Sequence, residues 1–297
     1  MTFSIVARSA DGAALGIAVA SKFLAVGAAV PAGEAEVGAL ATQAYANLAY
    51  RADGLRLLRD GATAAETVER LVAADPGRDE RQLGVVGRAG DGATFTGAKC
   101  HDWAGGTAGD GFAIQGNILT GPDVVDAMRT AWLAGTPAAG AAGAAGAAGA
   151  AGAPLARRLL DALTAGDHAG GDRRGRQSAA LLVVRMGGGY GGTSDVEVDL
   201  RVDDGPDPVP ELGRLLELHE LYFGRPDPET LIDLTGELAV EVADRLARLG
   251  HLMPGDGRVP AADLDAALAS WAGIENLEER LVPGRIDPLV LATLRKT

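Results

Sequence analysis

The chain starts with residues 1–22, MTFSIVARSADGAALGIAVASK, and this stretch predicts a β-hairpin. Residues 2–8 are mostly β-branched or apolar, which is typical of a strand. Residues 9–13 carry the small and polar side chains of a turn, and residues 14–22 are small and apolar again. We therefore expect two antiparallel strands around which the rest of the chain is organised.

Thr2 is the candidate nucleophile of this hairpin. A turn centred near Gly12 places Thr2 opposite residues 20–22, so the second strand is expected to bring Lys22 beside it. Removal of Met1 would leave Thr2 with a free α-amine, which can act as general base for its own hydroxyl. The charge of Lys22 would favour the reactive forms of both groups. The alternative is that Thr2 merely begins an edge strand.

The composition indicates a soluble globular protein. The 297 residues are 47% hydrophobic and 23% charged, and no apolar run reaches the roughly 18–20 residues that a membrane helix needs. The N-terminus lacks the pattern of a secretory signal, and the single cysteine, Cys100, fits a reducing compartment. We therefore expect a cytoplasmic protein without membrane contact. The net charge of −13 argues against binding to nucleic acid.

The order of predicted elements favours an α+β sandwich, with helices outside antiparallel sheets, over a repeated βαβ pattern. Residues 136–153 are a Gly/Ala low-complexity segment, which we interpret as a flexible surface loop. A Pro-rich boundary at 224–228 separates a domain of residues 1–224 from a helical domain of residues 229–297. After the hairpin, the predicted strands are 26–31, 37–43, 82–88, 93–97, 112–115, 178–186 and 196–202, and the predicted helices are 47–60, 63–74, 122–134, 155–165 and 209–223.

Five motifs in residues 1–224 occur together: TFSIVA (2–7), AVASKF (18–23), RQLGVV (81–86), IQGN (114–117) and GDRRGRQSAA (171–180). With these motifs, residues 1–224 resemble a bacterial family, the domain of unknown function numbered 1028. The resemblance implies a branch of the N-terminal-nucleophile (Ntn) hydrolases, with the four-layer αββα sandwich of those enzymes. The reaction of the family is not established, so the resemblance implies a fold and a mechanism but no substrate.

The tail contains the motifs VADRLARLG (242–250) and IENLEER (274–280), with Ile286-Asp287-Pro288 after them. With these motifs it is similar to a peptidoglycan-binding-like domain that often follows this family. Because no secretory signal directs the chain to a cell wall, we expect membership of that family rather than sugar binding.

Other polar residues are candidates for the same site. Ser4 faces the same side of the first strand as Thr2 and is a candidate for substrate contact. Asn117 follows a strand and can stabilise an oxyanion, although a turn-forming asparagine is the alternative. The Gly-rich loop 170–177 contains Asp172, Arg173 and Arg176, and arginine forks bind carboxylates or phosphates. The alternative for this loop is that Asp172 holds it together.

Three further patterns do not predict sites. Residues 187–192 match G-x-G-x-x-G, but a strand follows instead of a helix, so they are interpreted as a hairpin loop. Cys100-His101-Asp102 lacks the spacing of a nucleophile set in extended chain. The four histidines have no ligand spacing, so we expect neither a metal nor another cofactor.

Together these patterns favour an Ntn-type amidohydrolase acting on a small acidic amide or ureide. Thr2 would be the nucleophile, Lys22 would tune it, Asn117 would hold the oxyanion, and Arg173 and Arg176 would bind the acidic group. The alternative is a non-catalytic scaffold that binds a small anionic ligand, or binds a partner or glycan through its tail. We also expect a homodimer, for which the tail is one candidate module.

Overall fold

The computed structural model describes residues 2–135, 154–253 and 259–297. The predicted Gly/Ala loop at 136–153 lies outside the described residues. The chain divides into two compact units, Met1–Leu216 and Glu217–Thr297, each of which has its own core. No helix in the described ranges is long and apolar enough to cross a membrane.

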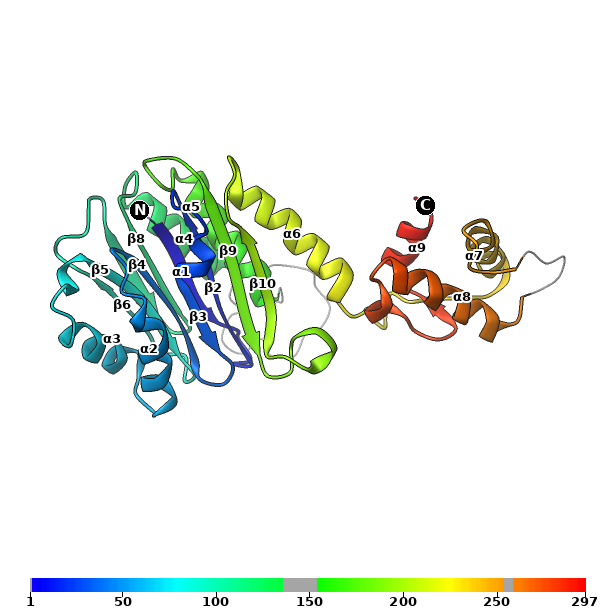
Figure 1. Ribbon diagram of the computed structural model, residues 1–297, viewed down its shortest axis with the longest axis horizontal. Helices are drawn as coiled ribbons and strands as arrows, with labels where there is room; N and C mark the ends of the chain where they lie inside the picture. The colour runs from blue at the N-terminus through cyan, green and yellow to red at the C-terminus, as the bar shows by residue number, and fades with distance from the viewer. Residues whose placement is uncertain (1, 136–153, 254–258) are drawn as a thin grey trace. The chain divides into compact units, whose positions relative to one another are not determined.

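A six-stranded antiparallel sheet forms the centre of the first unit (Figure 1). The predicted hairpin is confirmed, because Phe3 pairs with Ala20 and Gly12 adopts a positive φ of 75° at the turn. In spatial order the strands are β10 (Val196–Val202), β9 (Ser178–Arg185), β2 (Ala14–Ser21), β1 (Thr2–Arg8), β8 (Phe112–Asn117) and β7 (Gly105–Gly109).

A second, four-stranded antiparallel sheet faces the first. The facing side chains, including Val6, Ile17, Ala41 and Val86, form one buried apolar cluster, so the two sheets pack directly on each other. In spatial order the strands are β3 (Pro31–Glu34), β4 (Gly38–Ala44), β5 (Arg81–Gly87) and β6 (Gly92–Thr96).

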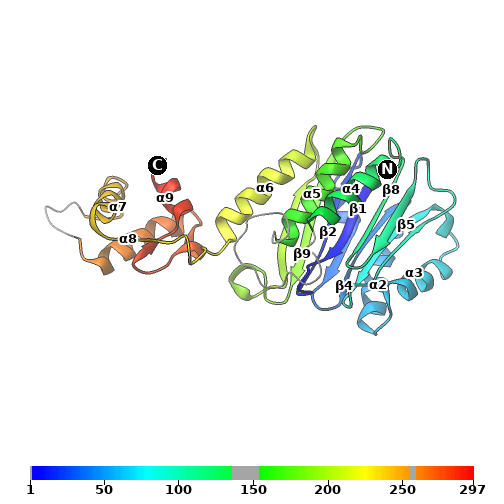
Figure 2. The ribbon, with the colours of Figure 1, turned by 180° about the vertical axis from the view of Figure 1, so that it is seen from behind.

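Helices cover the outer face of each sheet (Figures 1 and 2). Phe3 and Ile5 of β1 are buried with Met128 and Leu159 on the helical side of the large sheet. The mixed α+β composition is therefore confirmed. The large sheet carries α4 (Asp123–Ala134), α5 (Leu155–His168) and the first part of α6 (Pro208–Phe223), and the small sheet carries α2 (Ala49–Arg59) and α3 (Ala64–Ala73).

The start of α3 follows directly from the sequence. Thr63 accepts a hydrogen bond from the Glu66 backbone, and the Glu66 side chain accepts one from the Thr63 backbone N–H at 2.9 Å. This capping box satisfies two N–H groups that the helix cannot pair internally. The short 3₁₀ turn Arg78–Glu80 then leads into β5.

The strand predicted at residues 26–31 is wrong. Val26–Ala29 forms a short helix, α1, and β3 begins only at Pro31. The Val26 backbone N–H donates to Ser178 Oγ at 3.1 Å, and this hydrogen bond attaches α1 to the first residue of β9. A side chain at Gly27 would lie 2.6 Å from Ala180 Cβ, so only glycine allows this close packing. Strand β7 was absent from the prediction, because its sequence, GGTAG, has no strand pattern.

The second unit is helical. Helices α7 (Gly236–Arg248), α8 (Ala261–Ile274) and α9 (Pro288–Leu294) pack around Leu246 and Trp271, beside a two-stranded ribbon of β11 (Ile232–Asp233) and β12 (Arg285–Ile286). A buried ion pair joins Arg280 to Asp287 at 2.8 Å. Arg280 also donates to the Leu221 carbonyl at 2.6 Å, and Asp287 caps the start of α9.

We predict that Asp287→Ala destabilises the second unit by about 3 kcal/mol, because it leaves a buried guanidinium without its counter-ion and removes the α9 cap. Hydrogen exchange of residues 217–297 in the full chain measures this loss. Asp233→Ala is the control, since it removes an exposed partner of Arg285 and should cost at most about 1 kcal/mol. Equal losses in the two variants would contradict the role of the buried pair.

We predict that Gly84→Ala destabilises the first unit by about 1–3 kcal/mol. A Cβ at this position of β5 would lie 2.0 Å from Gln115 Oε1, which reaches across from the other sheet. Gly213→Ala is the control, because its Cβ would make only an ordinary 3.7 Å contact in the interior of α6. Chemical denaturation should show Gly84→Ala less stable and Gly213→Ala unchanged or more stable. The opposite order would contradict tight packing at Gly84.

Candidate functional site

A cavity of about 690 Å³ lies in the first unit, and the starting residue of β1 is part of its wall. Phe23, Val30 and Leu48 contribute an apolar side of the wall, and Thr2 and Asn117 contribute polar groups. Thr2 and Asn117 are paired residues of β1 and β8, so the sheet register fixes their separation. The ends of two central strands of the larger sheet therefore form one part of the wall, and Gln43 and Arg81 of the smaller sheet form another.

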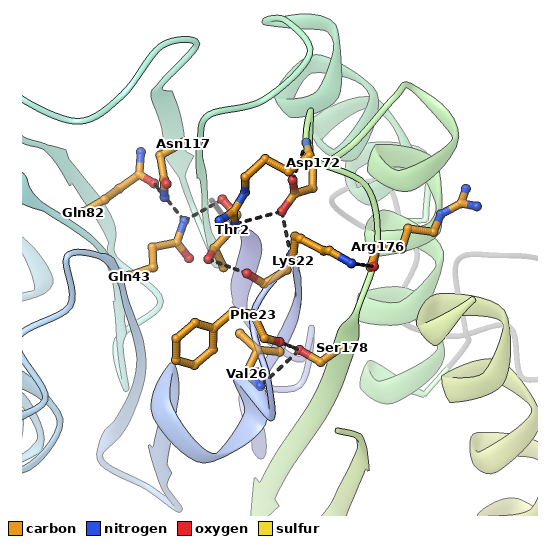
Figure 3. Close-up of polar contacts among 12 residues, drawn as sticks. Thr2, Lys22, Phe23, Val26, Gln43, Gln82, Asn117, Asp172, Arg176 and Ser178 are labelled. Atoms are coloured by element: carbon orange, nitrogen blue, oxygen red, sulfur yellow. Dashed lines mark hydrogen bonds and ion pairs between the residues drawn. The ribbon is translucent and has the colours of Figure 1, made fainter. Parts of the chain in front are cut away.

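Thr2 is almost fully buried at this cavity, with 6% of its surface exposed. Its Oγ1 lies 3.1 Å from Ser21 Oγ at the end of β2, and either hydroxyl can donate. Its carbonyl oxygen accepts a hydrogen bond from Gln43 Nε2 at 3.2 Å (Figure 3). The Thr2 side chain and backbone are thus both held by hydrogen bonds.

Lys22 does not bring its charge to Thr2. Its Nζ donates to the Arg176 carbonyl at 3.2 Å, and Figure 3 shows the side chain directed toward Arg176 and away from Thr2. The register pairs Phe3 with Ala20, so Ser21 is the residue opposite Thr2 and Lys22 lies beyond the strand end. Lys22 is exposed, and its backbone N–H donates to Asp172 Oδ2 at 2.7 Å.

The Arg-rich loop sends one arginine to the cavity, and that residue is Arg174. Arg176 instead forms a forked pair with Asp167, with both N–O distances 2.8 Å, and this pairing raises the pKa of Arg176. Arg173 is exposed and is not among the residues that line the cavity. Asp172 is buried and accepts from the Arg174 backbone N–H at 2.8 Å, so it holds the loop in place.

Asn117 belongs to a buried hydrogen-bonded network that extends behind the cavity. Its Nδ2 donates to Gln82 Oε1 at 2.9 Å, and Gln43 Nε2 donates to the same oxygen at 2.8 Å. Ser4 is fully buried in this network and donates to Gln43 Oε1 at 2.7 Å. Ser4 is therefore behind the cavity wall rather than part of it.

Sequence reasoning missed the glutamines of this network. Three of the four glutamines in the chain, Gln43, Gln82 and Gln115, lie in strands and are at most 1% exposed. The available signal was a long polar side chain inside a strand of small and β-branched residues. Such residues are rarely buried without hydrogen-bond partners, so each one indicated a polar layer between the sheets.

Basic side chains contribute to the cavity wall. Arg81, His101 and Arg174 contribute to its wall, and none of the described lining residues is Asp or Glu. Arg81 is held by Asp75 at 2.9 Å, and its hydrogen bond keeps the pKa of Asp75 well below the usual range. In a chain of net charge −13, this lining favours an anionic ligand.

Two other features complete the wall. Burial raises the pKa of the Cys100 thiol, which donates to the Arg81 carbonyl at 3.3 Å, so Cys100 is not an activated thiolate. Ala44 and Ile118 have positive φ angles of 65° and 51°, which are unusual for residues with a Cβ. Within the described residues, no group of three or more His, Cys, Asp or Glu is arranged to hold a metal ion.

Comparisons with known proteins agree with this fold. The solved structure of protein SPO2555 from Silicibacter pomeroyi, itself assigned to DUF1028, is 29% identical and has a TM-score of 0.61. The similarity covers 81% of this chain and 92% of that one. None of the curated proteins matches the chain.

Two family models match the chain. Residues 222–294 match a model described as "Putative peptidoglycan binding domain". Residues 2–212 match DUF1028, described as a family of unknown function. Since this second match spans well over half of the sequence, the chain belongs to the DUF1028 family.

Proposed function

We propose that this protein is an Ntn-type amidohydrolase whose nucleophile is Thr2 after removal of Met1. The observation that carries the proposal is the position of Thr2 at the wall of a 690 Å³ cavity, on a strand whose register pairs it with Asn117, a second residue of that wall. The order of helices, sheet, sheet and helices supports assignment of the αββα sandwich of the Ntn hydrolases.

The reaction would proceed in two steps. Thr2 Oγ1 attacks the carbonyl carbon of a substrate amide, and its proton passes to the Thr2 α-amine. Asn117 Nδ2 donates to the oxyanion, the C–N bond breaks, and the α-ammonium protonates the departing amine. Water, deprotonated by the α-amine, then hydrolyses the Thr2 ester and releases the acid. Ser21, at 3.1 Å from Thr2 Oγ1, would orient the hydroxyl.

The cavity wall suggests the class of substrate. Arg174 and His101 favour an anionic group, whereas Phe23 and Leu48 favour an apolar body. We therefore propose a small amide or ureide that carries a carboxylate. In this proposal Arg174 takes the role that the sequence suggested for Arg173 and Arg176, because Arg174 lines the cavity and its ion pair with Asp172 is long, at 3.4 Å. Arg176 is instead held in a forked pair with Asp167 at 2.8 Å.

A second candidate function rests on the same wall. A cavity with cationic and apolar groups, and with no carboxylate among the described residues that line it, can bind a small anion without any reaction. Such a scaffold would retain ligand affinity but would form no covalent adduct at Thr2. Reactivity of Thr2 toward an electrophile therefore separates the two candidates.

The tail has a candidate function of its own. The match of residues 222–294 supports binding of peptidoglycan strands by the helical unit. We expect the full chain to sediment with purified, insoluble peptidoglycan and to remain in the supernatant with cellulose. Equal recovery with both polymers, or with neither, would contradict specific binding of peptidoglycan.

We predict that a β-lactone forms one covalent adduct on the protein and that the adduct maps to Thr2. Thr2→Ala should form no adduct, because it lacks the hydroxyl, and Thr2→Ser should retain the adduct, because it keeps a hydroxyl beside an α-amine. Intact mass spectrometry before and after lactone treatment counts the adducts, and peptide mapping locates them. Both replacements leave a small residue after Met1, so we expect Met1 to be removed from both variants.

An adduct that persists in Thr2→Ala would place the nucleophile elsewhere and contradict the proposal. Absence of any adduct on the unmodified sequence would contradict the hydrolase and favour the binding scaffold.

A further inference from the structure

Gln82 contacts two of the polar groups of the cavity wall from behind. It lies on β5, is fully buried, and is itself not part of the wall. Its Oε1 accepts hydrogen bonds from Gln43 Nε2 at 2.8 Å and from Asn117 Nδ2 at 2.9 Å (Figure 3). One oxygen atom therefore orients an amide from each of the two sheets.

The direction of the Gln82 amide is fixed by its other end. Gln82 Nε2 lies 2.7 Å from the Gly116 carbonyl oxygen and 3.2 Å from that of Gly105. Carbonyl oxygens only accept hydrogen bonds, so the group facing them has to be the NH₂ of the amide. The oxygen of Gln82 must then face Gln43 and Asn117.

The orientation of the Gln82 amide also fixes the orientations of the Asn117 and Gln43 amides. A reversed Asn117 would place its oxygen against Gln82 Oε1, two buried acceptors without a proton between them. Gln43 is restrained twice, because its Nε2 also donates to the Thr2 carbonyl oxygen at 3.2 Å. Ser4 Oγ donates to Gln43 Oε1 at 2.7 Å, which satisfies the oxygen of Gln43 and completes its environment.

We infer that Gln82 is the positioning residue of the site: it holds Asn117 with its NH₂ group in place for an oxyanion and, through Gln43, fixes the Thr2 backbone. This inference rests on the proposed function. An Asn117 amide has two N–H hydrogens, and donation of one to Gln82 leaves the second for the reacting group. Preorganised donors of this kind stabilise a developing charge without reorganisation.

The test compares Gln82→Leu with the unmodified protein in the rate of Thr2 acylation by a β-lactone. A lost positioning contact should lower the maximal acylation rate about 10-fold or more, while the half-saturating lactone concentration stays within about 2-fold. If Gln82 had only a structural role, folded Gln82→Leu would not show a lower maximal rate at an unchanged half-saturating concentration. Gln177→Leu is the control, because it is the same substitution at a glutamine outside the network, whose hydrogen bond to Asp204, at 3.0 Å, is exposed.

Gln82→Glu supplies a second readout. The introduced carboxyl can replace the amide only when protonated, since an ionised oxygen would face the Gly116 and Gly105 carbonyls. Burial and these carbonyls raise its pKa above that of an exposed glutamate. Relative to the unmodified protein at the same pH, acylation of this variant should be nearly normal at acidic pH. It should then fall as the pH rises through the raised pKa.

Each outcome has one meaning. A slower maximal rate in Gln82→Leu, or a falling relative rate in Gln82→Glu, supports the positioning role. Unchanged acylation in folded Gln82→Leu overturns it and leaves the proposed function intact. If Gln82→Leu does not fold, a flat relative rate across pH in Gln82→Glu overturns it instead. An unmodified protein that is never acylated at Thr2 overturns the proposed function and the positioning role together.

Discussion

Strand β1 is hydrogen-bonded along both edges, to β2 on one side and to β8 on the other, and the site depends on this pairing. Its odd residues, such as Phe3 and Ile5, pack under helices, and Val6 packs against the second sheet. In a strand held at both edges and both faces, a register shift of one residue would move every side chain to the wrong face. The pairing and packing of this strand therefore also fix the position of Thr2 at its start.

The layer between the sheets is apolar along most of its length and polar near Thr2. Buried amides are costly unless their hydrogen bonds are satisfied, and the amides of Gln43, Gln82 and Asn117 are joined into a network with one direction. A layer of leucines or valines would satisfy the packing but could not orient Asn117. The polar end of the layer therefore tolerates fewer residue types than the apolar part, but it gives the hydrogen-bond donors at the cavity a defined arrangement.

The sequence predicted local features better than relations between distant residues. The hairpin turn at Gly12 and the Thr63–Glu66 capping box depend on neighbouring residues, and both were predictable from the chain. The position of Lys22 depended on a one-residue difference in register and on a carbonyl supplied by another loop. The role of Gln82 could not be predicted, because its partners come from strands that meet only in the folded protein.

The proposed mechanism requires a free α-amine on Thr2, and the mass of the protein purified without an N-terminal tag tests this requirement most directly. We expect a mass lower than that of the full 297-residue chain by one methionine, with Thr2 as the first residue in terminal peptide sequencing. A protein that keeps Met1 has an amide in place of the proposed general base. Complete retention of Met1 in active or ligand-binding material would contradict the account.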